Sequence, residues 1–177
     1  MNKKLKAWGA AGAVFAAAAG PLLHFAFAWS GNNALVGVVS AVNESVWEHM
    51  KLLAMPVLFF TALQFAVVGR HCPNFPAARG ISILAGLAVI PLLFYGYTAV
   101  LGGNVMWVDI ALFFLADFFL FWLDSMLLRQ GRLASNGWRK AGAALLLGIL
   151  FLFIWFTFRP PHLGLWRDSV TGGYGIP

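Results

Sequence analysis

Charged residues are scarce in this chain. Asp, Glu, Lys and Arg make up 10% of its 177 residues, whereas an ordinary soluble domain carries about a quarter. Hydrophobic residues make up 61%, and the mean hydropathy is +0.81. The shortage of charge excludes an ordinary soluble domain and indicates an integral membrane protein.

Acidic residues and cysteine are also few. Six Asp and Glu stand against twelve Lys and Arg, which gives a net charge of +6. Positive charge can indicate nucleic-acid binding, but these basic residues lie in short loops between apolar runs, as they do where they set membrane topology. We therefore expect no nucleic-acid partner. The single cysteine, Cys72, excludes an internal disulfide, and we interpret it as an ordinary reduced thiol.

Long apolar runs fill most of the chain. A helix of about 20 apolar residues crosses a hydrocarbon core about 30 Å thick, and the runs are continuous rather than alternating, which disfavours a transmembrane barrel. The sequence predicts one all-α transmembrane domain over residues 1–177, in contact with the lipid bilayer. The predicted spans are about 7–29, 45–69, 80–101, 105–128 and 141–158, and residues 159–177 form an irregular tail.

The segments between the spans predict the topology. Residues 34–42 are apolar but too short to cross, so we expect a re-entrant or interfacial segment before the second span. Residues 70–79 contain two prolines and are interpreted as a loop. Because basic residues favour the inner side, we predict that the N-terminus is inside and the C-terminus outside. Nine of the twelve basic residues then lie inside: Lys3, Lys4, Lys6, Arg70, Arg79, Arg129, Arg132, Arg139 and Lys140.

Residues 43–49, with the sequence NESVWEH, are the most polar stretch in the chain. Ser45 and Glu48 have the spacing of a capping box, in which the hydroxyl accepts from the Glu48 N–H and the carboxylate accepts from the Ser45 N–H. The spacing predicts a helix that begins at Ser45. A purely structural role is therefore one interpretation of this pair.

The predicted topology brings several polar residues to the outer side. His24 lies near the outer end of the first span, His49 begins the second and Asp109 begins the fourth. Zinc takes nitrogen and oxygen ligands from separated elements, so His24, His49 and a carboxylate such as Asp109 or Glu44 could bind it. We predict His24, His49 and Asp109 as ligands of a divalent metal such as zinc, although the chain has no HExxH motif.

The same stretch offers catalytic groups. Ser45 could be a nucleophile with His49 as its base, or Glu44 or Glu48 could be a general base whose pKa an apolar setting raises. We predict Glu44 as the base, Ser45 as a group that polarises the substrate, and Glu48 as a further catalytic candidate. Asp117 and Asp124 lie deeper in the predicted membrane, where carboxylates normally face a partner or a cavity.

Five stretches carry a resemblance: His24, residues 29–32, 43–49, 157–161 and 168–176. Together they resemble an uncharacterised family of small bacterial multi-pass membrane proteins that has a domain of unknown function. The resemblance covers essentially the whole chain. It implies a location in the bacterial inner membrane and no assigned activity.

A second, local resemblance concerns Ser45-x-x-x-His49. This element is similar to one in the alkaline ceramidase and adiponectin-receptor-like membrane hydrolases, which implies zinc chemistry. Those proteins have seven spans and an additional H-x-x-x-H motif, whereas this chain has five predicted spans and lacks that motif.

Three classes of function remain open from the sequence. The first is a metal-dependent membrane hydrolase of a small-molecule or lipid-like substrate in the cell envelope. The second is a module that binds or transports an ion or a small solute, with Asp117 or Asp124 carrying it inward. The third is a non-catalytic subunit, in a homo-oligomer or a larger membrane complex.

Overall fold

The structure is a computed structural model that describes residues 3–177. Met1 and Asn2 lie outside the described residues. Among the described residues the only strand-like pairing is an isolated bridge between Arg167 and Tyr174. The helices are α1 (Lys3–Trp29), α2 (Ala34–Gly37), α3 (Val46–Val67), α4 (Phe75–Leu101), α5 (Met106–Gln130) and α6 (Asn136–Phe158), with 3-10 turns η1 (Gly69–His71) and η2 (Gly164–Trp166).

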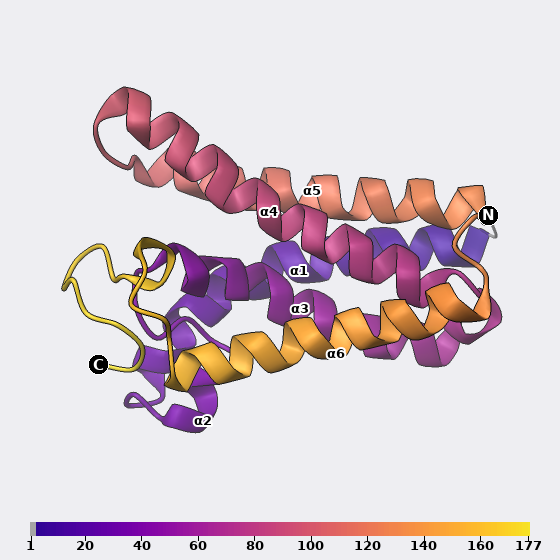
Figure 1. Ribbon diagram of the computed structural model, residues 1–177, viewed down its shortest axis with the longest axis horizontal. Helices are drawn as coiled ribbons and strands as arrows, with labels where there is room; N and C mark the ends of the chain where they lie inside the picture. Colours follow the sequence, from indigo (N-terminus) through magenta and orange to yellow (C-terminus); the bar gives the residue numbers. More distant parts are fainter. Residues whose placement is uncertain (1–2) are drawn as a thin grey trace.

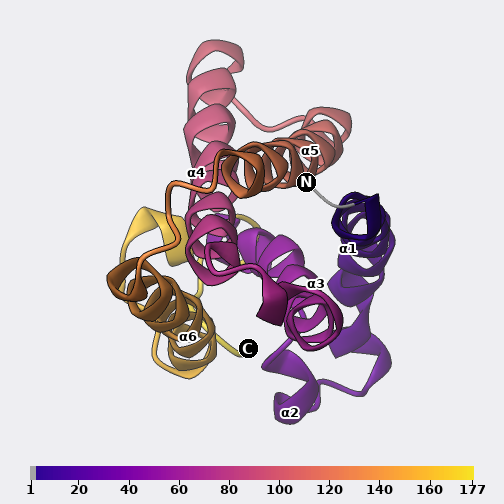
Figure 2. The same cartoon turned by 90° about the vertical axis from the view of Figure 1, so that its right-hand side faces the viewer.

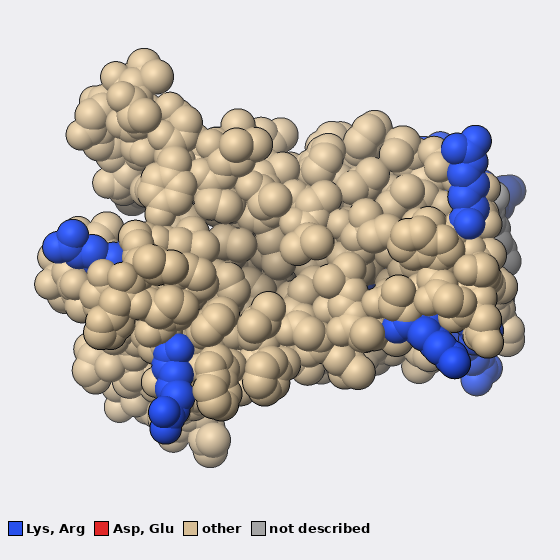
Figure 3. Space-filling view, in the orientation of Figure 1, with Lys and Arg blue, Asp and Glu red and all other residues tan. Residues whose placement is uncertain are grey.

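Five of these helices, α1, α3, α4, α5 and α6, are long and apolar enough to cross a membrane. They run along the length of the molecule, and the two ends of the chain lie at opposite ends of it (Figure 1). Figure 3 shows basic side chains near both ends of one face and none along its middle. The predicted all-α architecture with five spans is therefore confirmed.

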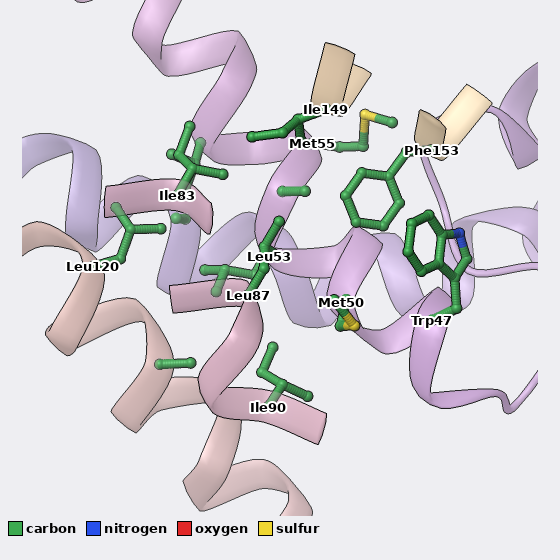
Figure 4. Close-up of a cluster of buried hydrophobic side chains, with 14 of the residues drawn as sticks. Trp47, Met50, Leu53, Met55, Ile83, Leu87, Ile90, Leu120, Ile149 and Phe153 are labelled. Atoms are coloured by element: carbon green, nitrogen blue, oxygen red, sulfur yellow. The ribbon is translucent and has the colours of Figure 1, made fainter. Parts of the chain in front are cut away.

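α3 and α4 form the centre of the bundle (Figure 2). We compare the most apolar 18-residue stretch of each long helix. In these stretches 61% of the residues are buried in α3 and 50% in α4, against 22% in each of α1, α5 and α6. The outer three helices therefore leave most of their apolar surface exposed, where it can contact lipid. Side chains from four helices meet in the core of Figure 4, among them Trp47, Met50, Leu53, Met55, Ile83, Leu87, Ile90, Leu120, Ile149 and Phe153.

The start of α4 corrects the predicted loop over residues 70–79. The helix begins at Phe75, and Pro76 lies in its first turn, where the missing N–H of proline breaks no hydrogen bond. α6 also begins earlier than the predicted residue 141, because Ser135 caps it and accepts from Trp138 N at 3.3 Å.

Arg79 consequently lies inside a helix and not in a basic loop. Its side chain is fully buried and makes two hydrogen bonds to the carboxylate of Asp124, at 3.1 and 2.9 Å. It also donates to Thr61 Oγ1 at 3.1 Å and to Gln64 Oε1 at 2.8 Å. This network joins α3, α4 and α5. Arg79 therefore stabilises the packing of these helices, and the prediction that places it in a loop is wrong.

Removal of Arg79 tests this network. Arg79→Met leaves the Asp124 carboxylate buried without its cation, which costs about 3–5 kcal/mol for a buried pair. We expect a large drop in the thermal unfolding temperature in detergent, partly restored in Arg79→Met/Asp124→Leu. Arg70→Met, at an exposed position, is the control, and an equal drop there would contradict the assignment.

α4 and α6 approach each other backbone to backbone at Gly142. A Cβ atom at this position would meet the backbone of Pro76 and Ala77. Small residues allow such close helix packing in membranes. Gly148 lies on the same helix, and a Cβ atom added there would meet no other atom within 4 Å, so it provides a matched comparison.

We expect Gly142→Ala to lower the unfolding temperature, since overpacking costs about 1–3 kcal/mol. Gly148→Ala should leave it unchanged or raise it, because alanine favours a helix by up to about 1 kcal/mol over glycine. Thermal unfolding of both variants in one detergent measures the difference. Equal effects at the two sites would show that α4 and α6 are not this close.

Candidate functional site

Two histidines and a glutamate meet at the end of the bundle that holds the C-terminal segment, which we call the site end. His24 comes from α1, Glu44 from the segment before α3, and His49 from the first turn of α3. His24 Nε2 lies 3.7 Å from Glu44 Oε1, and His49 Nε2 lies 3.5 Å from Glu44 Oε2. One donor atom from each residue lies within 4.8 Å of the other two. We call these residues the His–Glu cluster.

The turn before α3 places Glu44. Ser45 caps the helix and accepts from Glu48 N at 3.3 Å, so half of the predicted capping box is correct. The reciprocal bond is not formed, because the Ser45 N–H donates to Asn43 Oδ1 at 2.9 Å and the Glu48 carboxylate accepts from Val42 N at 3.1 Å. The serine hydroxyl is buried in this cap.

A backbone hydrogen bond orients the ring of His49. Its Nδ1 lies 2.9 Å from the carbonyl oxygen of Ser45. A carbonyl only accepts, so the geometry assigns the proton to Nδ1 in the neutral ring. The lone pair then lies on Nε2, the atom that faces Glu44. This is the arrangement in which histidines bind metals, with the second nitrogen fixed by an outer hydrogen bond.

Glu48 faces the protein interior. Its carboxylate lies 2.6 Å from the ammonium of Lys51, and both side chains are almost fully buried. Lys51 Nζ also donates to Gly37 O and to Thr157 Oγ1, each at 2.8 Å. The pair therefore ties the segment after α1 and the end of α6 to α3, which gives Glu48 a structural role beside the cluster.

The C-terminal segment packs against the turn before α3. Asn43 Nδ2 donates to Gly175 O at 2.8 Å, and Ser169 Oγ donates to the Glu44 carbonyl at 3.1 Å. The segment is irregular, as the sequence predicts, but it is held in place. Together with α4 it lines a cavity of about 510 Å³ to which Glu44 also contributes.

A carboxylate organises the loop in this segment. Burial raises the pKa of Asp168, but hydrogen bonds to its carboxylate outweigh burial, and the net pKa lies below the usual value of a carboxyl. The donors are Val170 N at 2.8 Å and the hydroxyl and N–H of Thr171 at 2.8 and 3.3 Å. Asp168 is therefore ionised, and it is engaged mainly within its own loop, with a further contribution from the backbone of Glu44.

The other predicted residues lie apart from the cluster. The Asp109 carboxylate accepts from the hydroxyl of Tyr97 and from Asn104 Nδ2 at 3.0 Å, at the tip of the α4–α5 hairpin, which leans away from the other helices (Figure 1). Asp117 is buried, and its Oδ1 has no hydrogen-bond partner within residues 3–177. Of the three predicted ligands, the structure thus brings His24 and His49 together, with Glu44 as the neighbouring carboxylate.

Five membrane-spanning helices and a His–Glu cluster at one end define a small multi-pass membrane protein. Over residues 1–176 the sequence matches a family described as "Family of unknown function (DUF6512)", and the chain belongs to this family. No curated protein and no solved structure matches it. This match confirms that the chain resembles a family of unknown function over its whole length. The similarity to membrane hydrolases rests on Ser45 and His49 alone.

The two glutamates of the motif should respond differently to loss of charge. Glu48→Gln leaves the Lys51 ammonium buried without a counter-ion, which costs about 3–5 kcal/mol, so the unfolding temperature should fall strongly. Glu44→Gln is the matched control, since its side chain is 45% exposed and should change stability little. Thermal unfolding in detergent with a chelator measures both, and a larger loss for Glu44→Gln would contradict the buried pairing.

Proposed function

We propose that this protein is a zinc-dependent hydrolase of the membrane, with His24, Glu44 and His49 as the metal ligands. The observation that carries the proposal is that donor atoms from three separate segments lie within 4.8 Å of one another. Two histidines and a glutamate are also the ligand set of several zinc hydrolases. Glu44 takes the place in this set that the sequence prediction gave to Asp109.

The separations of the donor atoms support this proposal. Two ligands about 2.0–2.1 Å from a tetrahedral zinc ion lie about 3.3–3.4 Å apart. The distances from Glu44 to His24 and to His49 are 3.7 and 3.5 Å. Each histidine therefore lies within a few tenths of an ångström of the separation that zinc ligation requires from one oxygen of the Glu44 carboxylate.

Three protein ligands leave room for water. The side chains of His24, His49 and Glu44 are 27%, 38% and 45% exposed, so the cluster is open on one side. A zinc ion with an open fourth position lowers the pKa of its bound water to about 7. Held by His24, Glu44 and His49, such an ion would supply an activated water for the hydrolysis of an acyl or phosphoryl bond.

The predicted roles of the other motif residues change within this proposal. Ser45 supports the site through its carbonyl, which fixes His49, and Glu48 supports it through Lys51. Transport along the bundle is less well supported, because no hydrogen bond among the described residues joins the cluster to Asp117 or Asp124, and Asp124 is held by Arg79.

We also propose the inner membrane as the location, with the site end outside. A helical bundle suits that membrane, since outer-membrane proteins are typically barrels. Of the twelve basic residues, Lys51 and Arg79 are buried. Arg159 and Arg167 belong to the site end, and the remaining eight lie toward the opposite end, which the positive-inside rule assigns to the cytoplasm.

Elemental analysis of the purified protein tests the metal site. We expect one zinc ion per chain in the wild type, and a loss of about 10-fold or more in zinc affinity for His49→Ala, as measured by competition with a chromophoric chelator. His71→Ala is the matched control, because this exposed histidine lies at the far end of the bundle next to Arg70.

The outcomes separate the functions. Equal zinc contents in the wild type and His49→Ala would overturn the site. Iron in place of zinc would keep the ligand set, which also suits ferrous iron, but would overturn the hydrolase. If zinc binds as expected, release of product from ester or phosphoester lipids should depend on His49 and stop on addition of a chelator.

A further inference from the structure

Arg167 carries an unpaired charge at the site end. Its side chain is exposed, and no hydrogen bond or carboxylate within residues 3–177 engages its guanidinium. The neighbouring Asp168 is occupied by Val170 and Thr171. An added Cβ at Gly172 would lie 3.3 Å from Arg167 Nη2, so the guanidinium lies over a residue that has no side chain to cover it.

This guanidinium lines the cavity of about 510 Å³ beside the His–Glu cluster. The volume falls within the range of about 300–1,000 Å³ that is typical of ligand sites. Arg167, Glu44 and Asp168 belong to its polar wall, and Phe94 and Tyr95 of α4 belong to its apolar wall. Figure 3 shows the corresponding hollow between the tip of the α4–α5 hairpin and the C-terminal segment. The cavity thus combines one free cation and an aromatic surface with two carboxylates, of which that of Asp168 is already hydrogen-bonded by Val170 and Thr171.

The apolar side of the cavity continues onto lipid-facing surface. Tyr95 is exposed, and the tip of the hairpin above it carries large apolar side chains that no other part of the described chain covers. A ligand with acyl chains could therefore reach the cavity sideways from the bilayer. The exposed residues of this tip include Val100, Leu101, Met106 and Trp107.

We propose that the cavity binds the head group of an anionic phospholipid, with Arg167 holding the phosphate and the acyl chains lying along α4. A guanidinium suits phosphate because its planar fork of donors can form two parallel hydrogen bonds. Glu44 lines the cavity and belongs to the cluster, so the head group lies next to the proposed metal. That this lipid is also the substrate rests on the proposed function, whereas its binding does not.

A binding measurement in detergent with EDTA tests the proposal. The probe is a fluorescent phosphatidylglycerol, compared with phosphatidylcholine of the same chains and with inorganic phosphate. We expect Arg167→Gln to weaken phosphatidylglycerol binding about 10-fold or more, as for other hydrogen bonds to charged groups. Arg167→Lys keeps the positive charge but lacks the planar fork of donors, so its affinity for phosphatidylglycerol should lie between those of the wild type and Arg167→Gln.

Arg159→Gln is the matched control, since this second arginine of the site end lies over the ring of Trp155 at 5.9 Å. It should keep phosphatidylglycerol affinity within about twofold, which is under half a kilocalorie per mole. Equal loss in Arg159→Gln, or none in Arg167→Gln, would overturn the proposal. Full displacement of the lipid by millimolar phosphate would instead assign the site to free phosphate.

The two proposals fail separately. EDTA removes any metal, so binding that depends on Arg167 would stand even if elemental analysis found no zinc. Conversely, one zinc ion per chain without phosphatidylglycerol binding would overturn only the lipid site. Unfolding temperatures of the Arg167 variants, expected to match the wild type because the side chain is exposed, exclude misfolding as the cause of any loss.

Discussion

The buried ammonium of Lys51 is the interaction on which the site end depends. Moving a charge out of water costs several kilocalories per mole unless partners replace the water. Here the carboxylate of Glu48, the carbonyl of Gly37 and the hydroxyl of Thr157 replace it. These partners come from three separate parts of the chain. The turn that carries Glu44 is therefore fixed between α3, α6 and the segment after α1.

A second buried ion pair has the same function at the other end of the bundle. Arg79 and Asp124 join α4 to α5 and, through Thr61 and Gln64, to α3. A cluster of buried apolar side chains fills much of the core (Figure 4), with the Asp117 carboxylate buried as well. Interdigitated apolar side chains already favour one arrangement, and a buried ion pair adds a constraint because it is stable only with its partners in place. The two pairs thus fix the position of each helix along the bundle axis relative to its neighbours.

The sequence predicts the spans well, because apolar length alone determines which segments can cross a bilayer. The sequence-based prediction fails where one residue type occurs in two structural contexts. Pro76 marks loops and also the first turns of helices, and Asp109 and Glu44 are equally plausible partners for the histidines. Contacts between distant residues have no local signal at all, as with the hydrogen bond from Asn43 to Gly175 across 132 positions.

That long-range contact has a consequence for how the protein is made. Asn43 and Glu44 leave the ribosome early, whereas Ser169 and Gly175, which hold them, follow all five spanning helices. A chain still being inserted into the bilayer therefore lacks one wall of the cavity beside Glu44. The cavity is completed only after the last spanning helix has been made, so it has no finished wall while the chain is still being inserted.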